Sequence, residues 1–143
     1  MASRRKGRIL AFQALYSWES GRIPPGDLMT FSWLEAGKLA SLDDATACFS
    51  RLLIAGTIEN IKAVDKMIVD HLENWDISRL NRVDLAILRM SVYTMMFQND
   101  IAPTIIIDEA IGISKEYGTD DSFRFINGVL DSIRKTLQAR NAP

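Results

Sequence analysis

Apolar residues recur every three or four positions along nearly the whole chain, which is the spacing of one face of an α-helix. In the first segment Ile9, Phe12 and Tyr16 form such a stripe, and Gly21 is well placed to end the helix. A second, short helix is predicted within residues 28–39. Helical spacing therefore dominates the N-terminal third of the chain.

The middle of the chain predicts two longer helices. Apolar residues keep to one face from Ile54 to Leu72, and either Ser41 or Asp43–Asp44 is expected to cap the start of this long helix. Residues 80–97 carry apolar side chains on two faces, with Ser78 as the candidate cap. A helix that is apolar on two sides is expected in the middle of a bundle.

Two further helices are predicted at the C-terminal end. Pro103 suits the first turn of the fifth helix and Gly118 its end, while Thr119 is the candidate cap of the sixth. The sixth helix shows an apolar stripe made of Phe123, Ile126, Leu130, Ile133 and Leu137. These patterns predict an all-α fold class.

Charge is distributed unevenly along a chain whose net charge is only −1. Residues 1–22 hold five basic residues and one acidic residue, whereas residues 24–50 hold one basic and four acidic residues. A basic end on an otherwise neutral protein indicates an anionic partner such as nucleic acid, and a solvated tail is the competing interpretation. Gly7 lowers the helix propensity of the basic run by about 1 kcal/mol relative to alanine, so we expect this arm to order only when RNA binds.

Composition excludes several classes of protein. Uncharged runs reach only ten residues, too few for a bilayer span, and no secretory signal is recognisable, so we expect a cytoplasmic protein without membrane contact. With Cys48 and His71 as the single residues of their kinds, an internal disulfide and the usual zinc sites are excluded. No Walker loop, Rossmann glycine pattern or paired histidines occur, so we expect neither catalysis, nor a metal, nor a cofactor.

Two groups of residues suggest RNA contacts. The basic residues of the arm precede the apolar stripe instead of lining its opposite face: Arg4, Arg5, Lys6 and Arg8. In the last helix Phe125 points roughly 110° away from the stripe and shares its side with Asp121 and Arg124. An aromatic ring beside an arginine is a platform on which a base can stack, and burial against a neighbouring helix is the competing interpretation.

Four blocks of sequence together resemble the NusB family of bacterial transcription antitermination factors. The first is the basic run followed by AFQALYSWE at residues 11–19. The others lie within residues 54–65, 80–93 and 108–131, and the last contains YGT at 117–119 and FINGVLD at 125–131. The blocks occur in order over nearly the whole chain.

The resemblance implies six to seven helices in two packed helical bundles that share a long central helix. It describes one domain, residues 1–143, with an N-terminal bundle in 1–76 and a C-terminal bundle in 77–143. It also implies a non-catalytic protein that binds the boxA element of nascent ribosomal RNA as a single strand. The ribosomal protein NusE binds with it, and together they help the RNA polymerase antitermination complex to read through terminators.

Residue roles follow from the same resemblance. The arm cations Arg4, Arg5, Lys6 and Arg8 match the RNA-binding arm of the family. Tyr16, Asp121 and Phe125 match further positions of the RNA surface, and His71 stands where some relatives have a tyrosine. Asp84 matches an acidic position on the side that faces NusE.

Two other classes of protein stay open. A small helical enzyme could bind an anionic metabolite between its helices, with Arg82 and Arg89 on one face of the fourth helix lining the pocket. A helical dimerisation module would associate with itself and ignore RNA. The sequence leaves the oligomeric state, including a homodimer, undetermined.

Overall fold

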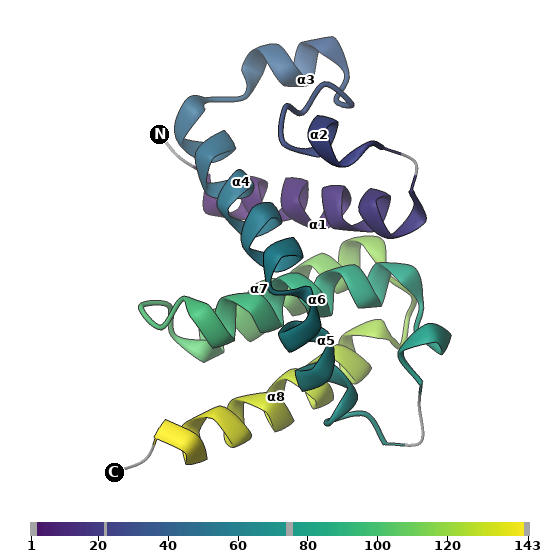
Figure 1. Cartoon of the computed structure of the whole chain (residues 1–143), viewed down its shortest axis with the longest axis vertical. Helices are drawn as coiled ribbons and strands as arrows, with labels where there is room; N and C mark the ends of the chain where they lie inside the picture. Colours follow the sequence, from purple (N-terminus) through teal and green to yellow (C-terminus); the bar gives the residue numbers. More distant parts are fainter. Residues whose placement is uncertain (1–2, 22, 74–75, 142–143) are drawn as a thin grey trace.

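The computed structural model describes residues 3–21, 23–73 and 76–141, in which eight α-helices, one short 3-10 helix and no β-strand occur (Figure 1). The elements are α1 (Arg4–Ser20), α2 (Pro25–Leu28), α3 (Ala36–Ser41), α4 (Asp44–Glu59), α5 (Ile61–Val69), η1 (Ile77–Arg79), α6 (Arg82–Phe97), α7 (Pro103–Tyr117) and α8 (Ser122–Asn141). The prediction of an all-α fold is confirmed. Among these helices, none combines the length and apolarity needed to span a bilayer.

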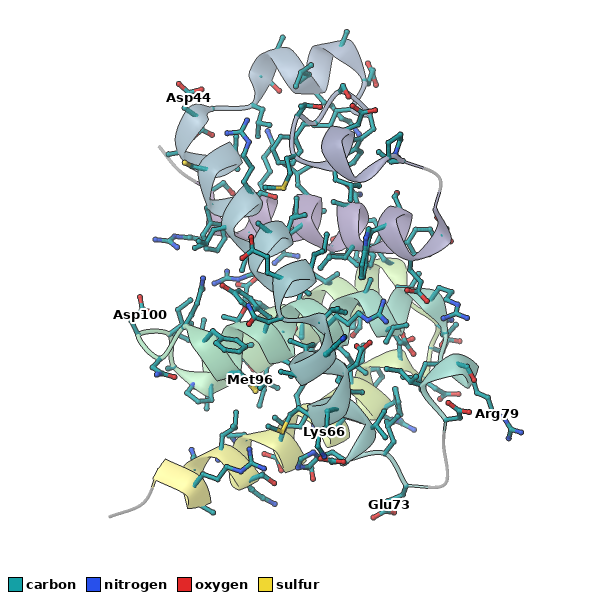
Figure 2. All side chains as sticks on the ribbon, viewed as in Figure 1. Asp44, Lys66, Glu73, Arg79, Met96 and Asp100 are labelled. Atoms are coloured by element: carbon teal, nitrogen blue, oxygen red, sulfur yellow. The ribbon has the colours of Figure 1, made fainter. Side chains whose placement is uncertain are left out.

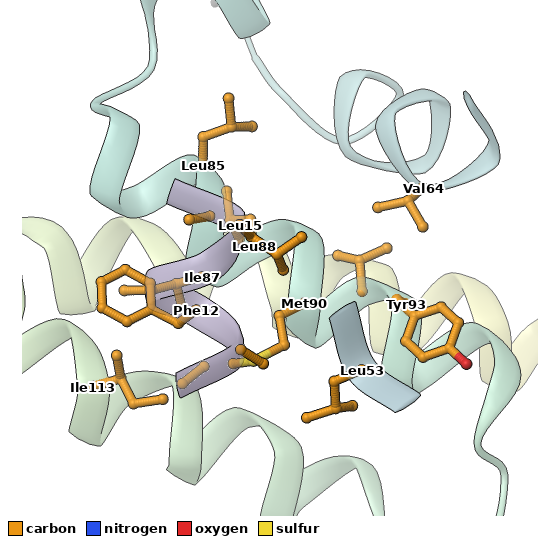
Figure 3. Packing of buried hydrophobic residues seen from close by; sticks show 14 of the residues in the cluster. Phe12, Leu15, Leu53, Val64, Leu85, Ile87, Leu88, Met90, Tyr93 and Ile113 are labelled. Carbon is orange, nitrogen blue, oxygen red and sulfur yellow. The ribbon is translucent and has the colours of Figure 1, made fainter. Parts of the chain in front are cut away.

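Helix α6 forms the centre of the molecule. Every residue from Asp84 to Met95 is buried, and the helix packs against α1, α4, α5, α7 and α8. Figure 3 shows Phe12 and Leu15 of α1 and Ile113 of α7 gathered around this helix. The two apolar faces predicted for this segment are therefore both used, as expected for a helix in the middle of a bundle.

The remaining helices pack on the two sides of α6. Helix α1 lies against α4, while α7 and α8 lie against each other, and α5 contacts both α6 and α8. Figure 1 shows α4 and α5 running along the length of the molecule, from the α1 side to the α8 side. The pair is thus shared between the two sides, and the boundary between bundles at residue 76 stays a prediction.

Several helix ends lie where the sequence predicts them. Gly21 adopts φ 70°, and its N–H reaches the carbonyls of Ser17 and Trp18, which ends α1 in a left-handed cap. Asp43 accepts the N–H of Thr46 and so caps α4. Pro103 begins α7.

The short helix predicted within residues 28–39 is wrong. Phe31 lies between α2 and α3 with φ 58°, in the left-handed region that bulky residues rarely adopt. Its side chain is fully buried, its ring lies 6.0 Å from that of Trp33, and the Trp33 Nε1–H donates to the Leu28 carbonyl. Burial of these two rings therefore outweighs the local helical spacing.

The predicted long helix is interrupted at Asn60. This residue has φ −109° and ψ 21°, and its side-chain amide donates to the Gly56 carbonyl at 2.8 Å. The chain consequently forms α4 and α5 in place of one continuous helix. Leu72 lies beyond the end of α5.

Two predicted caps are also wrong. Asn81, and not Ser78, caps α6 by accepting the N–H of Val83 at 2.8 Å. Helix α8 begins at Ser122, whose hydroxyl accepts the N–H of Thr119 at 3.0 Å. The helix therefore starts two residues later than a cap at Thr119 would place it.

Candidate nucleic-acid interface

The basic arm is the first part of α1, and it is folded. The N–H of Ser3 donates to the Thr46 hydroxyl at 2.9 Å, which ties the start of the arm to α4. Gly7 is buried, and a Cβ at this position would lie 2.7 Å from Cδ2 of Phe49. Glycine therefore permits the close approach of α1 to α4, and the expectations of a disordered arm and of a solvated tail are both wrong.

Two arm cations pack on the ring of Phe49. The guanidinium of Arg4 lies 4.4 Å from the ring centroid and that of Arg8 lies 5.5 Å from it. Arg8 is only 11% exposed and its Nη1 lies 3.9 Å from Oε2 of Glu109. Burial lowers the pKa of Arg8, while the charge of Glu109 acts in the opposite direction. Arg8 thus holds α1 against both α4 and α7.

Arg5 and Lys6 are exposed and face a groove. The closest acidic contact of Arg5 is with Glu116, at 3.8 Å between side chains that are 60% and 50% exposed. We call this cavity of about 420 Å³ the arm groove, and its lining includes Arg5, Lys6, Gln13, Leu34, Lys38 and Tyr117. It joins the arm to the end of α7 and to the segment around α3.

A second cavity of about 300 Å³, which we call the Tyr16 cavity, continues from the arm groove. Tyr16 and Val83 line it, and Gln13 and Tyr117 line both cavities. The ring of Tyr117 lies 5.2 Å from that of Phe12 at an angle of 54°, and the residue is 37% exposed. Sequence reasoning missed Tyr117 as a site residue, because only the fold places the end of α7 beside Tyr16.

Two more cavities flank Phe125. One of about 410 Å³ is lined by Arg79, Asn81, Asp84, Asp121 and Phe125. The other, of about 380 Å³, includes His71, Arg124 and Phe125. Figure 2 shows the Arg79 side chain pointing outward from the segment before α6, and sequence reasoning missed this cation as well.

Phe123 and Phe125 do not divide into a core residue and a surface residue as periodicity predicts, since both are half-buried. Phe125 is half-buried and packs against the hydrophobic core. Phe123 is absent from that core, and the Lys115 ammonium and Arg124 guanidinium lie 5.2 and 5.5 Å from its ring centroid. Phe125 therefore has a packed side and an accessible side, and Phe123 is not the core residue that the stripe predicts.

His71 joins α8 to the end of α5. Its Nδ1 lies 2.7 Å from the carbonyl of Met67 and its Nε2 lies 2.7 Å from the hydroxyl of Thr136. Because a carbonyl only accepts, Nδ1 donates to Met67, while Nε2 pairs with the Thr136 hydroxyl. His71 thus has a structural role, and its ring also lines the cavity beside Phe125.

Asp84 is buried, not on a face open to solvent as its predicted partner contact requires. The residue is 7% exposed, and its Oδ1 has no hydrogen-bond partner among the described residues. Burial raises the pKa of Asp84, with the hydroxyl of Ser122 acting in the opposite direction. Asp84 lines the same cavity as Asp121 and Phe125, which offers another molecule a route to the carboxylate.

The two arginines of α6 bind carboxylates of the protein itself. Arg89 contacts both oxygens of Asp65 at 2.9 Å and Oε2 of Glu19 at 2.7 Å, and Arg82 contacts Oε1 of Glu19 at 3.1 Å. Neither arginine lines any of the cavities described above. The hypothesis of a metabolite pocket built on these two cations is therefore wrong.

Most of the predicted RNA residues line two pairs of cavities. The arm groove and the Tyr16 cavity share Gln13 and Tyr117, while the two cavities around Phe125 share its ring. Val83 of the Tyr16 cavity and Asp84 of the cavity beside Phe125 are consecutive in the first turn of α6, so both pairs of cavities reach the start of this helix. This series of cavities, which we call the aromatic track, presents Tyr16, Tyr117 and Phe125 between groups of cations.

Comparisons with known proteins agree with this architecture. Over 131 residues the chain is 51% identical to the transcription antitermination protein NusB of Treponema denticola, which covers 92% of this chain and 95% of the relative. The solved structure of NusB from T. maritima superposes with a TM-score of 0.83 at 37% identity, covering 94% of this chain and 93% of that one. A structure described as antitermination factors NusB and NusE in complex with dsRNA gives a TM-score of 0.81 at 28% identity, covering 93% of this chain and 96% of the other.

A family model also matches most of the chain. It is described as the NusB family, and it matches residues 5–135, which include the arm from Arg5 onward and every helix from α2 to α7. The resemblance seen in four blocks of sequence thus extends over the intervening segments. The chain belongs to the NusB family.

Proposed function

We propose that this protein is a non-catalytic, RNA-binding transcription antitermination factor. It binds the boxA element of nascent ribosomal RNA together with the ribosomal protein NusE, so that RNA polymerase reads through terminators. The observation that carries the proposal is the aromatic track, which places three accessible aromatic rings and several cations in two pairs of cavities that both reach the start of α6. Aromatic rings beside cations suit a single strand, whose bases can stack while its phosphates pair.

The proposed contacts divide by chemistry. Arg5 and Lys6 bind phosphates, since both are exposed at the start of the track. Tyr16 and Phe125 offer ring faces to bases, and Arg124 lies in the cavity beside Phe125. Arg4 and Arg8 act mainly by fixing the arm on Phe49, while His71 positions the end of α5 against α8.

The remaining roles depend on partners. Asp121 lies at the same cavity as Asp84, so RNA and the ribosomal protein would meet near this point. We place the protein in the cytoplasm, where the transcript and the polymerase are found. The proposal gives the chain no chemical step, and its effect on transcription comes from binding alone.

A titration with boxA-type single-stranded RNA, with and without the ribosomal partner, tests the proposal. Replacing Arg5 and Lys6 with alanine should weaken binding and reduce the slope of log Kd against log salt by about 0.7 for each lost phosphate contact. Lys62→Ala is the matched control, because Lys62 is exposed on α5 and lines none of the cavities described above. The proposal would be contradicted if the parent bound boxA-type RNA no more tightly than a scrambled RNA. An unchanged salt slope in the variant without Arg5 and Lys6 would also contradict it.

A further inference from the structure

The arm groove has a second wall that does not belong to the arm. Leu34 and Lys38 come from the segment around α3, more than twenty residues beyond Gln13 of α1 in the sequence. Tyr117 closes the groove from the end of α7. Three segments that are distant along the chain therefore meet around one hollow of about 420 Å³.

Lys38 is unusual among its neighbours in sequence. It is the one basic residue within residues 24–50, a segment that also contains four acidic residues. The fold places this cation in the groove with Arg5 and Lys6, while no acidic residue lines the groove. Lys38 is exposed, so its ammonium can meet a ligand without a burial cost.

The groove chemistry fits a phosphodiester strand. Arg5, Lys6 and Lys38 supply cations from two sides, Gln13 supplies an uncharged polar group, and Leu34 and Tyr117 supply apolar surface for a sugar or a base. The pair between Arg5 and Glu116 is long and exposed, so it costs little for a phosphate to replace it. A ligand with regularly spaced negative charges and flat apolar groups uses all of these features.

We propose that the arm groove binds the backbone of a single-stranded RNA between the arm and α3, with Lys38 contacting a phosphate opposite Arg5 and Lys6. This inference rests on the proposed function, because it extends the same RNA surface across the segment that forms α3. The contact is to the backbone and not to base edges, so it is independent of RNA sequence. Lys38 therefore contributes equally to binding of boxA-type RNA and of an unrelated single strand.

The test compares Lys38→Ala with Lys62→Ala on two RNAs of equal length, one of boxA type and one an oligouridylate. Lys38→Ala should reduce the slope of log Kd against log salt by about 0.7 on both RNAs. Raising the salt from 50 to 200 mM should then weaken RNA binding by the variant about 2.5-fold less than RNA binding by the parent. Both variants should melt like the parent, because each changes an exposed side chain.

The outcomes separate this inference from the proposed function. If the parent binds both RNAs equally but Lys38→Ala still flattens both slopes, the boxA assignment fails and the groove assignment stands. If the parent prefers boxA and Lys38→Ala behaves like Lys62→Ala, the groove assignment is overturned and the proposed function stands. A parent that binds neither RNA overturns both. If Lys38→Ala weakens only the binding of the ribosomal partner, the groove is a surface for protein and not for RNA, which also overturns the inference.

Discussion

Arg89 offers a sharp test of what holds α1 against the rest of the molecule. Its side chain is 9% exposed and makes three charge-assisted hydrogen bonds, two to Asp65 of α5 and one to Glu19 of α1. The guanidinium also lies 5.6 Å from the ring centroid of Trp18. Replacing Arg89 with methionine keeps an apolar stem but leaves two carboxylates without their main partner.

The expected loss of stability follows from burial. Removing one partner of a buried ion pair costs about 3–5 kcal/mol, because the opposite charge stays uncompensated. Asp65 and Glu19 are 29% and 30% exposed, so water reaches both carboxylates and the lower value applies. We therefore expect a loss of about 3 kcal/mol for Arg89→Met, which lowers Tm by roughly 6–12 °C for a chain of this size.

Arg82 is the matched control for this measurement. It lies on the same helix and bonds the same Glu19, but its side chain is 48% exposed, so Arg82→Met should cost only about 0–1 kcal/mol. Urea unfolding of both variants, followed by circular dichroism, gives the two free energies of unfolding. Equal losses in the two variants, or a loss below about 1 kcal/mol for Arg89→Met, would refute the assignment of Arg89 as the anchor.

Three further predictions concern packing, pH and stacking. A Cβ on Gly56 would lie 2.2 Å from the Tyr93 hydroxyl oxygen, so Gly56→Ala should lose about 1–2 kcal/mol in urea unfolding despite its better helix propensity, and a gain would contradict the close packing. Because burial raises the pKa of Asp84, its carboxyl favours the fold at acid pH and this contribution is lost as the pH rises through the raised pKa. Asp84→Asn should therefore have a higher free energy of unfolding than the parent at pH 7. This difference should narrow on acidification and be absent below the ordinary pKa of 3.8. A difference independent of pH would show that another effect dominates. Phe125→Ala should weaken RNA binding by about 1–3 kcal/mol with a modest loss of stability, whereas Ile126→Ala, at a fully buried position, should lose about 2–5 kcal/mol of stability; parental RNA affinity in Phe125→Ala would remove it from the site.

The sequence predicts those parts of the fold that depend on local chemistry. The caps at Gly21 and Asp43, the start of α7 at Pro103 and the central position of α6 all follow from residue type and spacing. Phe31 shows where this reasoning stops, because its left-handed conformation is stabilised by burial that only the assembled core provides. Local propensity is a weak guide wherever tertiary packing opposes it.

The candidate site divides in the same way. Cations and aromatic residues with unusual positions can be found from the sequence, as Arg5, Lys6 and Phe125 were. The proximity of Tyr117 to Tyr16, or of Lys38 to the arm, results from contacts between distant segments and leaves no local signal. Phe123 was misplaced because it lies in the first turn of α8, where the helical stripe continues but the core does not.

The helical state of the arm has a consequence for the entropy and the heat-capacity change of RNA binding. Fixing the backbone of a disordered residue costs about 1–2 kcal/mol, so ordering residues 4–8 on binding would consume roughly 5–10 kcal/mol. With the arm already held by Ser3 and Phe49, that cost falls on protein folding and is absent from the binding equilibrium. Association then lacks the large negative heat-capacity change of coupled folding, and the affinity for RNA reports the contacts themselves.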